Sequence, residues 1–273
     1  MMRSLQDLEK YRLDATDGEI GRVKDVYFDD SAWVVRYLVV DTGSWLSSRK
    51  VLISPISIGR PDWVGHALKV SISRQQVKDS PSIDTDKPVS RQNEEQYLGY
   101  YGYPYYWGGA GMWGAGLYPY EMAPGYAAVG ADQAARERDE QIWLRTEEAR
   151  HRNDDPHLRS CKALDGYRIR AADGEIGHVA GYLIDDETWA VRFLIIDTSN
   201  WWAGHKVLVA CDWITDVSWV ERTVSIDLTR KAVKEAPPYD PDTPWSGQHD
   251  ASLYAHYGRA GYWAGRAKLE PRL

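Results

Sequence analysis

The stretch Asp17-Gly18-Glu19-Ile20-Gly21 recurs 156 residues further along the chain as Asp173-Gly174-Glu175-Ile176-Gly177. The segment that begins there, 17–53, is identical to 173–209 at 18 of 37 positions without a gap. Self-similarity at a fixed period is the signature of a duplicated structural unit. We therefore interpret the 273 residues as two copies of one module of about ninety residues, joined by a different kind of sequence.

Short β-strands account for most of the module. Asp17-Gly18 is a turn dipeptide, because glycine adopts positive φ without steric cost. The run 33–40 is rich in β-branched and aromatic residues, and only Arg36 in it is charged, which predicts a strand buried on both faces. Two further short strands are predicted at 50–54 and 68–73, and one helical turn at 74–79. Closing such a sheet removes its unpaired edges, so we expect a mainly β protein of two tandem small β-barrels.

The sequence that joins the two copies has a different composition. Residues 97–126 hold 11 Tyr or Trp and 8 Gly, and we expect neither a regular strand nor a helix of normal composition there. The segment 131–155 predicts one largely solvated helix. The second copy carries a shorter tail of the same kind, since Tyr257-Gly258 and Tyr262-Trp263 match Tyr101-Gly102 and Tyr106-Trp107. Three interpretations stay open: each tail wraps a barrel, contacts a partner, or is disordered.

Composition narrows the classes of partner and compartment. The net charge of -7 argues against broad binding to nucleic acid or to an anionic membrane. No stretch reaches the roughly 18 apolar residues of a membrane span, and the start has no apolar core of a secretory signal. The two cysteines, Cys161 and Cys211, cannot build a disulfide framework. We expect a cytoplasmic protein.

No group of residues predicts catalysis. The acidic pairs Asp17 with Glu19 and Asp29 with Asp30 fall in expected turns, and neither has the ligand spacing of a calcium loop. His151 and His157 lack further zinc ligands, and neither cysteine has a partner residue for nucleophilic chemistry. The glycines at 108–111 follow a tyrosine run rather than a strand and lack a downstream lysine. We therefore predict no catalytic, metal-binding or cofactor-binding residue, and a protein that is not an enzyme.

Arg36 and its counterpart Arg192 are the charged residues that need an explanation. An unpaired charge within a hydrophobic strand is costly, so each should have a partner. Asp41 and Asp197, or the acidic turns, are the expected partners, in a structural ion pair at the barrel rim or in an interface anchor. The repeated anchors that we predict, structural or interfacial, are Arg36, Arg192, Trp33, Trp189, Trp45, Trp201, Tyr101, Tyr106, Trp107, Tyr257, Tyr262 and Trp263.

The order of these motifs resembles the PRC-barrel domain family over about 4–88 and 160–244. The shared pattern is Asp-Gly-Glu-Ile-Gly, an apolar stretch to Asp-Asp, then Trp-x-Val-Arg and a hydrophobic run to Asp-Thr and Lys-Val-Leu. The chain looks most like stand-alone bacterial proteins with two PRC-barrels. The resemblance implies compact, strongly bent barrels that act as docking or assembly modules. The expected divisions are 1–90 and 157–244 for the barrels, 91–130 for the aromatic tail, 131–155 for the helix and 245–273 for the second tail.

We expect the protein to act by binding another molecule through its surface rather than by catalysing a reaction. The leading hypothesis is a non-enzymatic interaction or assembly scaffold with an unidentified protein partner, and a repeated surface also permits a homodimer. The resemblance alone suggests an RNA- or ribosome-linked assembly factor as the alternative. Residues 1–90 carry 13 basic and 13 acidic residues, which gives that alternative no basic surface. A small-ligand binder with an aromatic pocket is the least favoured hypothesis.

Overall fold

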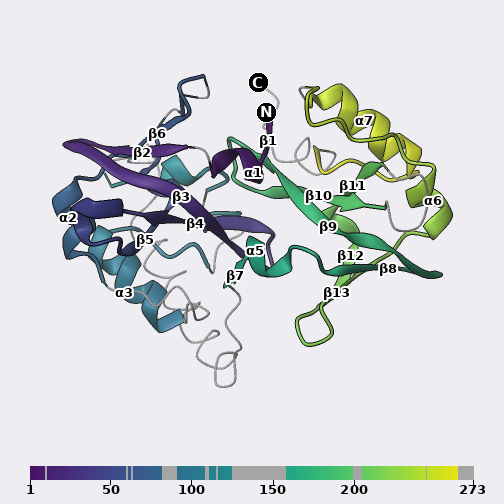
Figure 1. The fold of residues 1–273 in the computed structure, drawn as a ribbon, viewed down its shortest axis with the longest axis horizontal. Coiled ribbons are helices and arrows are strands. Elements are labelled where there is room, and N and C mark those ends of the chain that lie inside the picture. The colour runs from purple at the N-terminus through teal and green to yellow at the C-terminus, as the bar shows by residue number, and fades with distance from the viewer. Residues whose placement is uncertain are drawn as a thin grey trace, which may run out of the picture. The chain divides into compact units, whose positions relative to one another are not determined.

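A computed structural model describes residues 1–9, 11–59, 61–62, 64–81, 91–107, 111–114, 116–124, 158–198, 205–243 and 245–263 (Figure 1). The chain divides into two compact units. The Arg36 unit comprises Leu8–Cys161 and Thr188–Ala190. The Arg192 unit comprises Met1–Asp7, Lys162–Glu187 and Val191–Leu273. The expected helix at 131–155 lies outside the described residues.

The Arg36 unit contains a six-stranded sheet with the order β5-β4-β3-β2-β6, to which β7 adds by pairing with β3. All of these neighbours are antiparallel except β2 and β6, which are parallel. Its strands are β2 (Arg12–Ala15), β3 (Gly18–Asp29), β4 (Val34–Asp41), β5 (Lys50–Ile53), β6 (Ala67–Lys69) and β7 (Leu158–Ser160). Its longer helices are α2 (Arg74–Asp79) and α3 (Arg91–Tyr101), and short 3-10 turns lie at Gly43–Leu46, Pro55–Ser57 and Pro119–Met122.

The Arg192 unit repeats this arrangement with one extra strand. Its sheet has the order β11-β10-β9-β8-β13-β12, and β1 adds by pairing with β9. Its strands are β1 (Met2–Ser4), β8 (Arg168–Ala171), β9 (Gly174–Asp185), β10 (Val191–Asp197), β11 (Lys206–Ala210), β12 (Ile214–Ser218) and β13 (Thr223–Ile226). Its helices are α6 (Arg230–Lys234) and α7 (Gly247–His256), with a 3-10 turn at Cys211–Trp213. The short helices α1 (Leu5–Leu8) and α5 (Cys161–Leu164) directly follow β1 and β7.

The strand predicted at 33–40 is β4, an interior strand of the Arg36 sheet between β5 and β3. Every residue from Val34 to Val40 in β4 is buried, Arg36 included, which confirms a strand covered on both faces. Its partner β3 is bent by two register shifts, between Val23 and Asp25 and between Tyr27 and Phe28. Such bulges increase the local twist and bend a strand. The β9–β10 pair of the Arg192 unit carries two comparable shifts.

The repeated Asp-Gly turn holds the start of a helix in each unit. Asp17 accepts a hydrogen bond of 2.7 Å from the backbone N–H of Arg74 at the start of α2. Asp173 accepts the equivalent bond of 2.7 Å from Arg230 at the start of α6. A carboxylate at a helix N-terminus satisfies a free N–H and complements the helix dipole. The helical turn predicted at 74–79 is confirmed as α2.

Two expectations about the module need correction. The mainly β fold with two sheet units is confirmed, but within the described residues neither sheet closes into a barrel, because the end strands β5 and β6 are not paired with each other. The tail is also more regular than its composition indicates, since α3 runs through 97–101 and buries Tyr97 and Leu98. Those two side chains pack onto the sheet, so tertiary contacts stabilise a helix that composition alone does not predict.

We predict that Gly21→Ala lowers the free energy of unfolding by about 2–4 kcal/mol, because the new Cβ would overlap the backbone carbonyl of Asp41 in the neighbouring strand. Gly21 also has a φ of 155°, which disfavours a side chain. The matched control is Gly99→Ala in α3, where nothing lies within 4 Å of the added atom. Urea unfolding of both variants measures the difference, and equal stability would show that this close approach is not needed.

Candidate functional site

The most elaborate cluster in the Arg36 unit surrounds the guanidinium group of Arg36. This side chain is 3% exposed, and its Nη2 lies 3.2 Å from Oδ2 of Asp29, at the end of β3. Its Nη1 donates a hydrogen bond of 2.6 Å to the carbonyl oxygen of Met112. The guanidinium carbon lies 3.8 Å from the ring centroid of Tyr106 and 4.9 Å from that of Trp113. We call this group of five residues the arginine stack.

The Arg192 unit contains the arginine, the acid and the tyrosine of this arrangement at positions shifted by 156 residues. The guanidinium carbon of Arg192 lies 4.3 Å from the ring centroid of Tyr262, the counterpart of Tyr106. Its Nη2 lies 3.8 Å from Asp185, the counterpart of Asp29, so the two are an ion pair without a direct hydrogen bond. A cation over an aromatic face is stabilised by the ring quadrupole, and more strongly when water is excluded. Both arginines therefore have an acidic partner in the acidic turn, rather than Asp41 or Asp197.

A buried acid in each tail holds the tyrosine in place. Glu94 in α3 is 3% exposed and accepts hydrogen bonds from the hydroxyl of Tyr106 and, at 3.3 Å, from that of Tyr37. Asp250 in α7 is also 3% exposed and accepts bonds from the hydroxyl of Tyr262 at 2.8 Å and the indole of Trp245 at 2.6 Å. Glu94 and Asp250 are again 156 residues apart.

Burial changes the acid–base behaviour of the neighbouring tyrosines. Loss of hydration raises the pKa of Tyr37 well above its usual value, and the nearby Glu94 raises it further. Burial likewise raises the pKa of Tyr103 to about 12. The pKa of Tyr262 is raised by burial and by its contact with Asp250. These tyrosines are neutral at physiological pH, which suits a packing role rather than proton transfer.

The structure places the other predicted anchors within the units rather than together at one site. Trp33 stacks on Phe28 at 5.1 Å, and both Trp33 and its counterpart Trp189 adopt left-handed φ values of 52° and 61°. Tyr101 stacks on Tyr103 with ring centroids 5.4 Å apart. The hydroxyl of Tyr257 donates to the carbonyl oxygen of Leu208 at 3.4 Å.

The tail tryptophans pack against neighbouring tyrosines. Trp107 packs against Tyr105 and Tyr106. Trp263 packs against Tyr254 and remains 38% exposed. Trp201 lies outside the described residues.

Several participants in these clusters were missed from the sequence, and three of them are Glu94, Asp250 and Trp113. Glu94 and Asp250 are matched acids in the two tails, a repeat signal that could have identified them, although their types differ. Trp113 has no such signal, because 113 plus 156 falls at 269, a leucine beyond the repeated aromatic pattern. The indole of Trp113 is fully buried and donates a hydrogen bond of 2.9 Å to the carbonyl oxygen of Thr188, which is part of the same unit.

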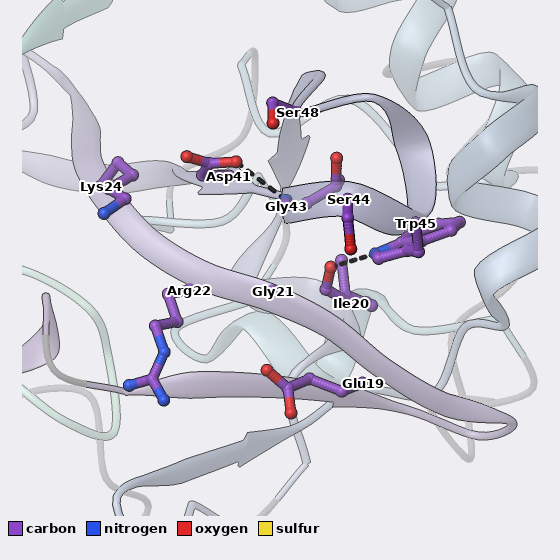
Figure 2. Close-up of a pocket in the computed structure, with 11 residues that line it drawn as sticks. Glu19, Ile20, Gly21, Arg22, Lys24, Asp41, Gly43, Ser44, Trp45 and Ser48 are labelled. Carbon is purple, nitrogen blue, oxygen red and sulfur yellow. Dashed lines mark hydrogen bonds between the residues drawn. The ribbon is translucent and has the colours of Figure 1, made fainter.

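An open hollow of about 370 Å³ lies beside β3 and is lined by residues from 19–24 and 41–48 (Figure 2). The indole of Trp45 donates to the carbonyl oxygen of Ile20 at 2.5 Å, and the N–H of Gly43 donates to Asp41 at 2.9 Å. Figure 2 shows Arg22 and Glu19 extending from β3 away from Asp41. A ligand pocket needs polar groups that converge on one point. In this hollow the Trp45 indole and the Gly43 N–H are already bonded to other lining residues, and Arg22 and Glu19 extend away from Asp41.

Other chemistry has little support in the described part of the chain. No group of three or more His, Cys, Asp or Glu side chains there is placed to hold a metal ion. Cys161 and Cys211 are buried and are not joined in a disulfide within the described residues, and burial raises the pKa of the Cys211 thiol. A raised pKa lowers the thiolate fraction and hence the reactivity of a cysteine. Among the described helices, none has both the length and the apolar character needed to cross a membrane.

Removal of the Arg36 guanidinium should destabilise the Arg36 unit. We expect Arg36→Ala to lower the free energy of unfolding by about 2 kcal/mol or more, because the variant loses a buried ion pair, a hydrogen bond and two aromatic contacts. Arg36→Lys keeps the charge but not the planar group, so an intermediate loss is expected. Arg22→Ala, on the exposed part of β3, is the control and should change stability by less than about 0.5 kcal/mol. Identical urea midpoints for all three variants would argue against a stabilising stack.

Alkaline pH should also reveal the buried tyrosines. The pKa of Tyr103 is about 12 in the folded protein, above the value of about 10 of an unfolded chain. The folded state therefore binds more protons between these values, and its stability falls as pH rises through this window. We expect urea midpoints to decrease from pH 9.5 to 11.5, with a smaller decrease for Tyr103→Phe. A slope that is unaffected by this substitution would contradict the assignment.

Comparison with known proteins agrees with the geometry of the Arg36 unit. Residues 11–73 match the family described as PRC-barrel domain. An uncharacterized protein from Deinococcus radiodurans is 36% identical over 89 residues, which are 29% of this chain and 32% of that protein. The chain thus spans about a third of the length of this curated relative. The family match covers β2 to β6 and includes Arg36, but not the second copy. The similarity to the PRC-barrel domain family is therefore shown for residues 11–73 of this chain.

Proposed function

We propose that this protein is a cytoplasmic, non-enzymatic scaffold that binds another protein or assists its assembly. PRC-barrel domains are in general protein-interaction modules, and residues 11–73 match that family. Cys161 and Cys211 are buried thiols that form no disulfide within the described residues, which is compatible with a reducing compartment. The observation that carries the proposal is the internal use of the arginine stack: within the described residues, its charged and aromatic groups contact one another.

Partner contact must then use other surfaces, and one exposed apolar residue is repeated. Val64 is 92% exposed and Val220 is 95% exposed, and they are 156 residues apart. Single exposed apolar residues are ordinary on a protein surface. A valine that is exposed at the equivalent position of both copies has no packing role that would account for it.

Both valines are presented by ordered turns. The carboxylate of Asp62 accepts a hydrogen bond of 2.8 Å from the N–H of Gly65, and Ser218 accepts one of 3.1 Å from Glu221. The residues that end these turns, His66 and Arg222, have left-handed φ values of 49° and 54°. A turn fixed in this way holds its apolar tip in place, and little conformational entropy is lost when a partner binds. We propose that these two tips, Val64 and Val220, contact the partner.

The test compares affinity capture by the native chain and by a Val64→Asp, Val220→Asp double variant. We expect one or more proteins to be enriched by the native chain and to be lost at least about tenfold with the variant, because each tip would place a charge in an apolar contact. The stability of the variant should stay within about 0.5 kcal/mol, since both valines are exposed. The control is Tyr120→Ser, which changes an exposed residue outside the two valine turns and should retain the partner.

Two outcomes would contradict the proposal. Equal capture by the native chain and the double variant would remove the valine tips as contact points. Recovery of RNA whose yield falls steeply with salt would instead favour the nucleic-acid alternative.

A further inference from the structure

The two copies of the module exchange their first strands. β1 at Met2–Ser4 and β7 at Leu158–Ser160 occupy equivalent positions, 156 residues apart. β1 pairs with β9, the long strand of the second copy, while β7 pairs with β3, the long strand of the first copy. Each compact unit therefore contains the first strand of the other copy.

The two pairings have the same register. Arg3 lies opposite Ile184 in one unit, and Arg159 lies opposite Phe28 in the other. Both members of the second pair follow from the first by the 156-residue repeat, with the copies interchanged. A slip of one residue would turn every side chain of a strand to the other face, so register is specified rather than accidental.

The same ion pair fixes both strands. Nε of Arg3 lies 3.2 Å from Oδ2 of Asp186, and Nε of Arg159 lies 3.1 Å from Oδ2 of Asp30. Both carboxylates are at most 14% exposed, so these pairs are screened less than surface pairs. The sequence separations of the partners differ, at 183 and 129 residues, yet the contact is identical.

We infer that the edges of β3 and β9 are one repeated self-recognition surface, whose partner is the first strand of a second copy of the module. On this inference the chain is a covalently joined form of a strand-exchanged homodimer. Strand addition satisfies backbone groups that an open sheet edge leaves unpaired, and the arginine–aspartate pair fixes the position of the added strand. The inference does not depend on the proposed scaffold function, because it concerns the pairing of the copies and not an external partner.

Engineered disulfides in the full chain distinguish exchanged from unexchanged strands. With Cys161 and Cys211 replaced by alanine, the exchanged pairs are Ser4→Cys with Leu183→Cys, and Ser160→Cys with Tyr27→Cys, since these residues lie opposite each other. The matched controls recombine the same substitutions as Ser4→Cys with Tyr27→Cys, and Ser160→Cys with Leu183→Cys.

We expect mild oxidation to link the exchanged pairs at least about tenfold faster than the control pairs, as peptide mapping would show. Faster linkage of the control pairs, or equal rates in all four variants, would overturn the inference.

Charge reversal provides a second measurement that needs no cysteine. Arg159→Glu places two like charges together at Asp30 and should lower the thermal midpoint by a few degrees. Adding Asp30→Arg should restore the midpoint, because the pair is rebuilt with opposite signs. Adding Asp186→Arg instead should not restore it, since Asp186 contacts the other arginine, Arg3. Restoration by Asp186→Arg and not by Asp30→Arg would show that each copy keeps its own strand.

Discussion

Burial of the Arg36 charge connects segments that are far apart in the sequence. A guanidinium removed from water needs a nearby anion and hydrogen-bond acceptors, or its desolvation is not offset. Asp29 supplies the anion from the end of β3, the carbonyl oxygen of Met112 supplies an acceptor, and Tyr106 covers one face. Nε of Arg36 has no hydrogen-bond partner within the described residues, so aromatic contact carries part of the compensation. The contacts of Arg36 therefore join β4 to the aromatic tail, so each stabilises the other.

This dependence explains why the compact unit extends past the family match. The match ends at residue 73, yet Glu94, Tyr97 and Leu98 in α3 are among the most buried residues of the unit. Tyr97 donates from its hydroxyl to the carbonyl oxygen of Leu52 at 3.0 Å. In the Arg192 unit the hydroxyl of Tyr257 contacts the equivalent carbonyl of Leu208. Leu52 and Leu208 are equivalent in the repeat, but Tyr97 and Tyr257 are not. The two copies therefore keep the hydrogen bond to this carbonyl and use a tyrosine at a different position to make it.

The sequence was sufficient for the features that are local or repeated. The Asp-Gly turn, the buried run of β4 and the helical turn of α2 follow from residue preference and spacing, and the repeat doubled each signal. The closure of the barrel was predicted wrongly, because edge pairing depends on strand direction in space and not on composition. Trp113 and the carbonyl of Met112 could not be found, since a backbone acceptor has no sequence signature and Trp113 has no counterpart in the second copy. The choice between Asp29 and Asp41 as partner of Arg36 likewise depended on how β3 bends.

The pairing of β1 with β9 has a consequence for how the chain folds during synthesis. Asp186 follows Arg3 by 183 residues, so at about 5–20 residues per second the first strand waits roughly 10–40 s for its partner to be made. During this interval the edge of β3 also lacks β7, which is made more than a hundred residues later. The sheet of the Arg36 unit is thus completed only after β7 of the second copy has been made. Until then the nascent first copy carries an open edge of the kind that promotes pairing between neighbouring chains on one messenger RNA.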